Sequence, residues 1–280
     1  MMVWQEYRKR YSVFLSALQQ TEMIIFLAGN AIADEDIKVQ ESDQYELPFL
    51  FNNFRKIMQE VSGGYKSDDQ FLNVKGLVDL VFQKQKERIL CSQELVMIMA
   101  HFEAFVADTL STIWHLDPKL LEGLKPGKEV LSKSKFSSLA SLSQEELSIL
   151  IEKSVYFKTQ KTINAPLDYL TNELGLGIEI NSTELLVAHL NRNAIVHNGG
   201  IITQKMYIDR LNPKEQKGLK PDTLIAIDIH YITKIYNLIL FLGEQIFSEV
   251  SKTYFNEMKP LQENELVTKR QPPDLPINPA

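Results

Sequence analysis

The sequence is poor in cysteine and in long apolar segments. Cys91 is the single cysteine among 280 residues, which excludes an internal disulfide and a cysteine-based zinc site and favours a reducing compartment. The longest apolar runs, at residues 23–33 and 235–243, fall short of the roughly 20 residues that cross a bilayer. Charged residues interrupt the apolar ones at the N-terminus, unlike in a secretory signal. These absences predict a cytoplasmic protein with no membrane partner.

A surplus of positive charge is also missing. Lys and Arg total 30 against 36 Asp and Glu, which gives a formal net charge of −6. Proteins that coat nucleic acid without regard to its sequence usually carry a basic surplus. The balance therefore disfavours that class, while leaving room for a local basic groove. Hydrophobic residues make up 44% of the chain and charged residues 24%, as in ordinary globular proteins that bury a full core.

Apolar residues recur at helical spacing over most of the chain, which predicts an all-α helical bundle. In the first expected helix, residues 3–30, they form one stripe: Trp4, Tyr7, Tyr11, Phe14, Leu15 and Leu18. Further helices are expected at residues 47–61, 77–114, 144–153, 166–173 and from 230 onward. The segment 77–114 is expected to form either one long helix or two helices that meet near Ser92. Residues 201–208 are β-like and predict a short extended arm.

The predicted bundle divides into three parts. Residues 1–76 are expected to form an N-terminal helical region packed on the bundle, and residues 77–258 form the principal helical domain. Four prolines lie within residues 271–280, and few core residues accompany them. The segment 259–280 is therefore expected to be a disordered tail.

Residues 181–200 predict one capped helix. Asn181 is placed to act as N-cap, with Glu184 three residues later as its capping-box partner. Gly199 and Gly200 supply the positive-φ residues that end a helix. Apolar residues lie on nearly every side of this helix, a pattern typical of burial on most sides. Polar residues within it therefore need an explanation.

Arg192, Asn193 and His197 share one arc of that helix with His189, roughly 140° wide at about 100° per residue. Burying an unpaired charge costs several kcal/mol, so Arg192 needs a partner. One interpretation is structural: Arg192 pairs with a carboxylate of a neighbouring helix, and His197 caps carbonyls at the helix end. The other is that these residues form a chemical site.

The pattern Arg-Asn-x-x-x-His-Asn-Gly at residues 192–199, on a capped helix of an apparently all-helical chain, resembles the RNase-type HEPN (higher eukaryotes and prokaryotes nucleotide-binding) superfamily. The signature of that family is Arg, usually followed by a polar residue, then His after four to six intervening positions. Here it is matched by Arg192, Asn193 and His197, with Asn198 as a supporting residue. The resemblance is most specific over residues 92–255, and it makes the principal domain HEPN-like.

The resemblance implies an up-and-down helical bundle, usually dimeric, in which the two signature helices meet in one RNA-cleaving cleft. An upstream helix of the family can carry an acidic residue, which makes Glu103 the expected partner of Arg192; a surface glutamate is the alternative. Arg192 and His197 lie about 7.5 Å apart along the helix axis, an awkward spacing around a single phosphorus. We therefore expect a homodimer through residues 184–200.

The implied activity is a metal-independent endoribonuclease that needs no cofactor. The RNA 2′-OH would attack the adjacent phosphodiester and leave a 2′,3′-cyclic phosphate. His197 would act as general base or acid, and Arg192 would bind the scissile phosphate and stabilise the transition state. Asn193 would bind the phosphate or orient His197. RNA is the expected partner; toxin or phage-defence biology is implied, with an antitoxin protein as a further partner.

Two other interpretations stay open. The chain can be a non-catalytic HEPN-like module that binds a nucleotide or a protein, with Arg192 and His197 structural, or a plain helical scaffold with an accidental motif. The acidic net charge favours the binding module, whereas the intact motif favours the enzyme. If RNA is the substrate, lysines such as Lys119 and Lys158 become candidate phosphate contacts.

Overall fold

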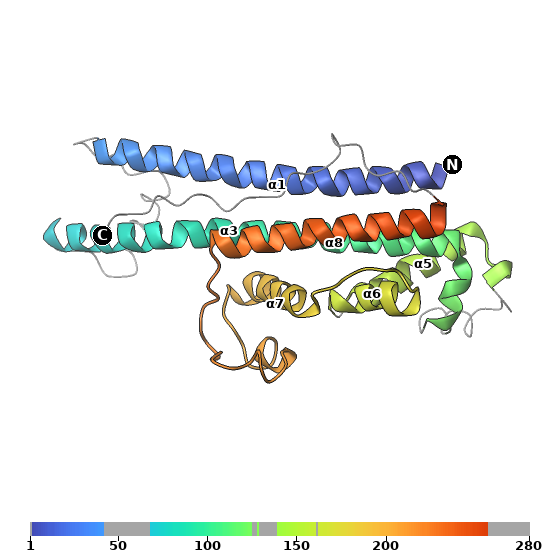
Figure 1. The fold of residues 1–280 in the computed structure, drawn as a ribbon. Coiled ribbons are helices and arrows are strands. Elements are labelled where there is room, and N and C mark those ends of the chain that lie inside the picture. The colour runs from blue at the N-terminus through green and yellow to red at the C-terminus, as the bar shows by residue number, and fades with distance from the viewer. Residues whose placement is uncertain (1, 42–67, 125–127, 129–138, 161, 257–280) are drawn as a thin grey trace. The chain divides into compact units, whose positions relative to one another are not determined.

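The computed structural model describes residues 2–41, 68–124, 128, 139–160 and 162–256, and only the helical backbone over 26–41 and 68–87. Three long helices dominate: α1 (Met2–Glu41), α3 (Asp68–Leu116) and α8 (Ile229–Phe255), as Figure 1 shows. Shorter elements complete the order: η1 (Pro118–Gly123), η2 (Leu139–Ser141), α5 (Gln144–Thr159), α6 (Asn164–Asp168), the π-turn η3 (Tyr169–Glu173), α7 (Ser182–Asn198) and η4 (Ile208–Arg210). The predicted all-α class is confirmed for this part of the chain. The helix expected at 47–61 and the tail at 259–280 lie outside the described residues.

The chain divides into two compact units. One comprises residues 1–21 and 92–280, and the other comprises residues 22–91. In the second unit, the described part is helical, over residues 22–41 and 68–91. The first unit contains all the predicted site residues, and the following description concerns that unit. The division into 1–76, 77–258 and 259–280 stays a prediction.

Of the two alternatives for residues 77–114, the break near Ser92 is absent, because α3 continues as one helix from Asp68 to Leu116. Serine is a common N-cap, but it does not end a helix without a breaker beside it, and residues 77–116 contain neither glycine nor proline. The part Arg88–Leu116 is long and apolar enough to cross a membrane by length and composition. Because 44% of its most apolar window is buried, and core helices pass the same test, this segment does not indicate a location.

The core of the first unit contains an aromatic seam, contributed by three helices: Trp4, Tyr7, Tyr11 and Phe14 of α1, Phe102 and Phe105 of α3, and Phe247 and Phe255 of α8. The rings of Tyr11 and Phe247 are stacked, with centroids 4.2 Å apart and planes 8° from parallel. Phe14 stacks on Phe105 at 4.7 Å. Such pairs add about 0.5–1.5 kcal/mol each beyond the buried area. Of the apolar stripe predicted for the first helix, Tyr7, Tyr11, Phe14, Leu15 and Leu18 are confirmed as core, whereas Trp4 is half-buried.

Gly243 of α8 lies directly against the seam. A Cβ atom at this position would overlap the ring of Phe14. The absence of a side chain at Gly243 is therefore what lets α1 and α8 approach closely. The apolar positions predicted for the last helix are all buried: Ile232, Ile235, Tyr236, Ile239, Leu240, Leu242, Ile246 and Val250.

The prediction of an extended arm at residues 201–208 is wrong. Ile201 forms a single antiparallel bridge with Leu224, and the chain then turns into η4. Isoleucines and threonine favour a strand, but an isolated two-stranded pairing has little stability without a larger sheet. Tyr207 and Ile208 are consecutive and both buried, whereas an extended strand would direct them to opposite faces. Burying both favours a turn.

Candidate functional site

The ends of α7 match the sequence pattern. The Asn181 side chain accepts a hydrogen bond from the Glu184 backbone N–H at 3.3 Å. Gly199 and Gly200 have φ of 61° and 83° and end the helix. The second half of the expected capping box does not form, because the Glu184 carboxylate pairs with Lys234 of α8. A cationic partner on the neighbouring helix holds this carboxylate away from the helix start.

Four side chains form a closed network between α7 and α3: Glu103, His189, Arg192 and Asn193. Arg192 Nη2 lies 3.3 Å from Glu103 Oε2, so the predicted ion pair is present. The other carboxylate oxygen of Glu103 lies 3.1 Å from His189 Nδ1. Arg192 Nη1 donates to Asn193 Oδ1 at 2.7 Å, and Asn193 Nδ2 lies 2.9 Å from His189 Nε2. Each member thus contacts two others.

Donor and acceptor rules give this four-residue network one direction. A guanidinium can only donate, so the oxygen of Asn193 must face Arg192 and its NH₂ must face His189. His189 Nε2 then has to accept, which leaves the imidazole hydrogen on Nδ1, where it is donated to the Glu103 carboxylate. His189 is buried, with 8% of its surface exposed. The network therefore holds a buried histidine in one tautomer.

His197 differs from His189 in its exposure and in its hydrogen bonding. It is exposed, and its side chain has no hydrogen bond or ion pair with any residue that the structure describes. The end of α7 is instead closed by backbone, since the N–H of Gly200 donates to the Ala194 carbonyl at 2.9 Å. The structural interpretation is thus half right: Arg192 pairs with a carboxylate, but His197 caps nothing in the described part. Its imidazole is available to an incoming group.

A pocket of about 400 Å³ lies beside α7, closed by the end of α5, the start of α6 and the loop 203–210. Three of the predicted site residues line it: Asn193, His197 and Asn198. Arg192 and Glu103 do not line it. The structure therefore brings the histidine and the two asparagines together, and directs the guanidinium of Arg192 into the network on α3. Within one chain, Arg192 and His197 do not face the same pocket.

The loop 203–210 is held against α7 by a buried asparagine. The Tyr207 hydroxyl donates to Asn191 Oδ1 at 2.5 Å, and Asn191 Nδ2 donates to the Tyr231 hydroxyl of α8 at 2.8 Å. Burial raises the pKa of Tyr207 to about 12. Each hydroxyl therefore stays protonated near neutral pH and serves as a structural hydrogen-bonding group. This anchor places Arg210, two residues beyond Ile208, on the lining of the pocket.

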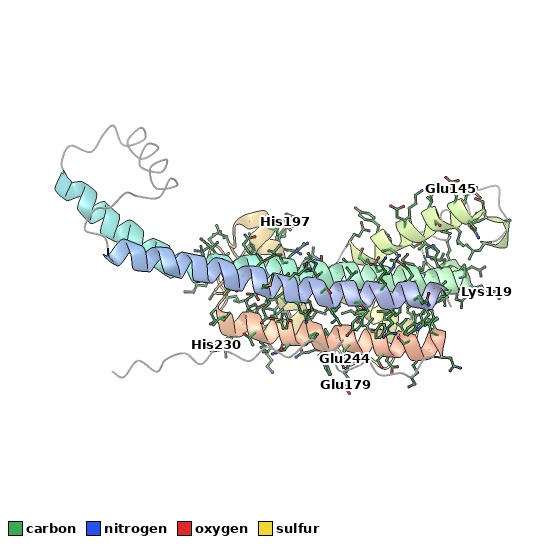
Figure 2. All side chains as sticks on the ribbon, turned by 90° about the horizontal axis from the view of Figure 1, so that it is seen from above. Lys119, Glu145, Glu179, His197, His230 and Glu244 are labelled. Atoms are coloured by element: carbon green, nitrogen blue, oxygen red, sulfur yellow. The ribbon has the colours of Figure 1, made fainter. Side chains whose placement is uncertain are left out.

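Sequence reasoning gave no role to His189 or Arg210. The i, i+4 spacing of His189 and Asn193 on one arc was a usable signal for the first. No local signal marks Arg210, which reaches the pocket only through the fold of the loop. Of the lysines proposed as phosphate contacts, Lys158 is bound to Glu173 at 3.1 Å, and Figure 2 shows Lys119 far along the ribbon from His197.

Within the described residues, no group of three or more His, Cys, Asp and Glu side chains is placed to hold a metal ion. Comparisons of the chain with protein-family models, curated proteins and solved structures found no match. Any function must therefore be inferred from the geometry of α7, its network and its pocket.

Proposed function

We propose that this protein is a metal-independent endoribonuclease of the RNase-type HEPN class. The observation that carries the proposal is His197: an exposed imidazole without a partner among the described residues, on the lining of a pocket beside α7 that has both polar and apolar sides. An imidazole is a side chain suited to proton transfer. The motif Arg192-Asn193 precedes it on the same helix, oriented by Glu103.

The reaction would be a transesterification within the RNA. The 2′-oxygen attacks the adjacent phosphorus, the bond from phosphorus to the 5′-oxygen breaks, and a 2′,3′-cyclic phosphate remains. One imidazole takes the proton of the 2′-OH, and a protonated group returns a proton to the leaving oxygen. Arg192 would neutralise the additional negative charge in the transition state. Asn193, which lines the same pocket as His197, would hydrogen-bond a phosphate oxygen.

A second copy of the chain would complete this site. Because Arg192 and His197 do not face one pocket within a single chain, a site that uses both needs a second α7. Val196, next to His197, is 49% exposed, and the bridged pair Ile201 and Leu224 are 39% and 55% exposed. This apolar surface adjoins the end of α7 and suits an isologous contact between two copies. The proposed enzyme is accordingly a homodimer.

Incubation of the purified protein with labelled total RNA in EDTA tests the proposal. We expect EDTA-resistant cleavage with cyclic-phosphate ends, and loss of at least about a hundredfold in His197→Ala, the low end for general acid–base catalysis. His230→Ala is the matched control, because His230 is exposed at the start of α8 and lies apart from His197 (Figure 2). Circular dichroism should show all variants folded. Full activity in His197→Ala would remove the proposal.

A non-catalytic nucleotide- or protein-binding module is the alternative that one observation favours. Arg192 is already held by Glu103 and Asn193, as expected of a structural arginine. Absence of any cleavage by the wild-type protein would favour this module.

A toxin or defence role, with RNA as substrate and an antitoxin protein as partner, predicts growth arrest on expression that His197→Ala relieves.

A further inference from the structure

We propose that the pocket beside α7 binds one nucleoside phosphate unit, with Arg210 as its phosphate-binding residue. This inference deepens the proposed function, because the same pocket holds His197. It assigns phosphate binding within one chain to a residue outside the α7 motif. It also names the ligand class by the chemistry of the lining.

Arg210 is the cation that the pocket offers to an anion. It is exposed at the end of η4 and lines the pocket with His197, and its side chain has no hydrogen bond or ion pair with any other described residue. The described residues of the lining include no Asp or Glu, so none of them supplies a carboxylate that neutralises the guanidinium. A guanidinium presents a planar fork of N–H donors that matches phosphate oxygens. Arg192 cannot take this role inside the chain, because it points to Glu103.

The backbone that presents Arg210 is fixed on both sides. Tyr207 and Ile208 before it and Leu211 after it are buried, and the Tyr207 hydroxyl is bonded to Asn191. The neighbouring carboxylate of Asp209 accepts from Gln204 Nε2 at 2.7 Å. Asp209, the acidic residue of η4, thus already has a hydrogen-bond partner. Because the backbone that carries Arg210 is already held, less of the chain has to be ordered on binding, which favours affinity.

The inner part of the pocket suits a nucleobase. Leu186, Leu190 and Ala194 give it an apolar side. Asn164 Oδ1 and Thr203 Oγ1 are buried in its lining and have no hydrogen-bond partner among the described residues. A buried polar atom left unpaired costs about 1–3 kcal/mol, which a ligand that bonds it recovers.

A nucleobase has apolar faces and a polar edge, which matches this lining. Proteins commonly recognise single-stranded RNA by binding its unstacked bases in this way. The volume of about 400 Å³ falls within the roughly 300–1,000 Å³ of small-molecule sites. One nucleotide with its phosphate at Arg210 therefore fits the size, polarity and charge of the pocket.

Fluorescence anisotropy with a labelled 2′-O-methyl oligoribonucleotide tests this, because such a probe cannot be cleaved by its 2′-oxygen. We expect Arg210→Ala to weaken binding by about tenfold or more, as for a lost hydrogen bond to a charged group. Lys217→Ala is the matched control: it removes one exposed positive charge from the same loop region, outside the pocket lining. It should change the Kd by less than about twofold. Equal weakening by both substitutions would overturn the inference.

Competition identifies the unit that binds. Adenosine 3′-monophosphate should displace the probe from the wild-type protein and do so far less well from Arg210→Ala, while adenosine and inorganic phosphate compete weakly. Displacement by adenosine as effective as by the monophosphate would overturn the role of Arg210. Arg210-dependent binding without cleavage would remove the nuclease proposal and keep this one. Cleavage of RNA by the wild-type protein, together with probe binding that Arg210→Ala does not weaken, would overturn this inference and keep the nuclease proposal.

Discussion

The aromatic seam and the four-residue network on α7 belong to the same compact unit, yet they are built on opposite principles. In the seam, rings from α1, α3 and α8 stack on one another, and the absence of a side chain at Gly243 leaves room for the ring of Phe14. In the network, four polar groups meet in one allowed donor order beside an open pocket. Burial is non-directional, whereas hydrogen bonding is directional. We infer that the seam carries stability and that α7 carries chemistry.

The largest effect should come from Phe105→Ala in the seam. Phe105 is 2% exposed and contacts the rings of Tyr7, Tyr11 and Phe14. Truncation leaves a cavity, and we expect the free energy of unfolding to fall by about 3–5 kcal/mol. Urea unfolding followed by circular dichroism measures this. Phe241→Ala on α8, where the ring is 40% exposed, should cost far less. Equal losses in the two variants would erase the distinction between seam and surface.

A smaller effect is expected from Glu103→Gln in the network. The new amide would turn an N–H₂ toward either Arg192 or His189, and both of these donate to the carboxylate. Because Glu103 is partly exposed, the loss in unfolding free energy should be about 1 kcal/mol.

The same substitution should release the tautomer of His189. Nitrogen NMR of the imidazole should show the Nδ1–H form in the wild type and a mixture in Glu103→Gln. Glu152→Gln on the exposed face of α5 serves as control and should change neither quantity. A wild-type His189 protonated on Nε2 would contradict the proposed direction of the network.

The smallest effect is a pH dependence of stability that arises from buried tyrosines of the seam and of the loop 203–210. Burial raises the pKa of Tyr7 and Tyr11 in the seam above 10.0, and that of Tyr207 to about 12. The unfolded chain then loses these protons first, so stability is complete below pH 10 and falls as the pH rises above it. Tyr11→Phe should flatten this fall in denaturant titrations. Tyr156→Phe, whose ring is 68% exposed, should not; an unchanged slope in Tyr11→Phe would refute the assignment.

Local patterns predicted much of this unit. The stripe of Tyr7, Tyr11 and Phe14, and the caps of α7 at Asn181 and Gly199, follow from periodicity and capping. The cost of a buried charge predicts that Arg192 pairs with some carboxylate; Glu103 as that carboxylate came from the family resemblance. These features depend on residues near one another in the chain or on a rule about burial. They needed no knowledge of how distant segments meet.

The features that escaped prediction depend on contacts between distant segments. The segment 201–208 turns because the Tyr207 hydroxyl bonds to Asn191, 16 residues earlier. That contact also places Arg210 at the pocket. His189 gains its role only through Glu103, 86 residues away. The alternative of a break at Ser92 is wrong for the converse reason, since neighbouring helix formers outweigh one capping residue.

The closed order of the network on α7 has a consequence for how this sequence can change. Each member fixes the donor direction of the next, so once one is replaced the others have already lost their defined partners. Substitutions at Glu103, His189 and Asn193 should therefore be strongly epistatic, with a double variant little worse than the worse single one. A homologous chain with a different residue at one of these positions is expected to have a different residue at another as well. The residue types at the four positions should therefore vary together.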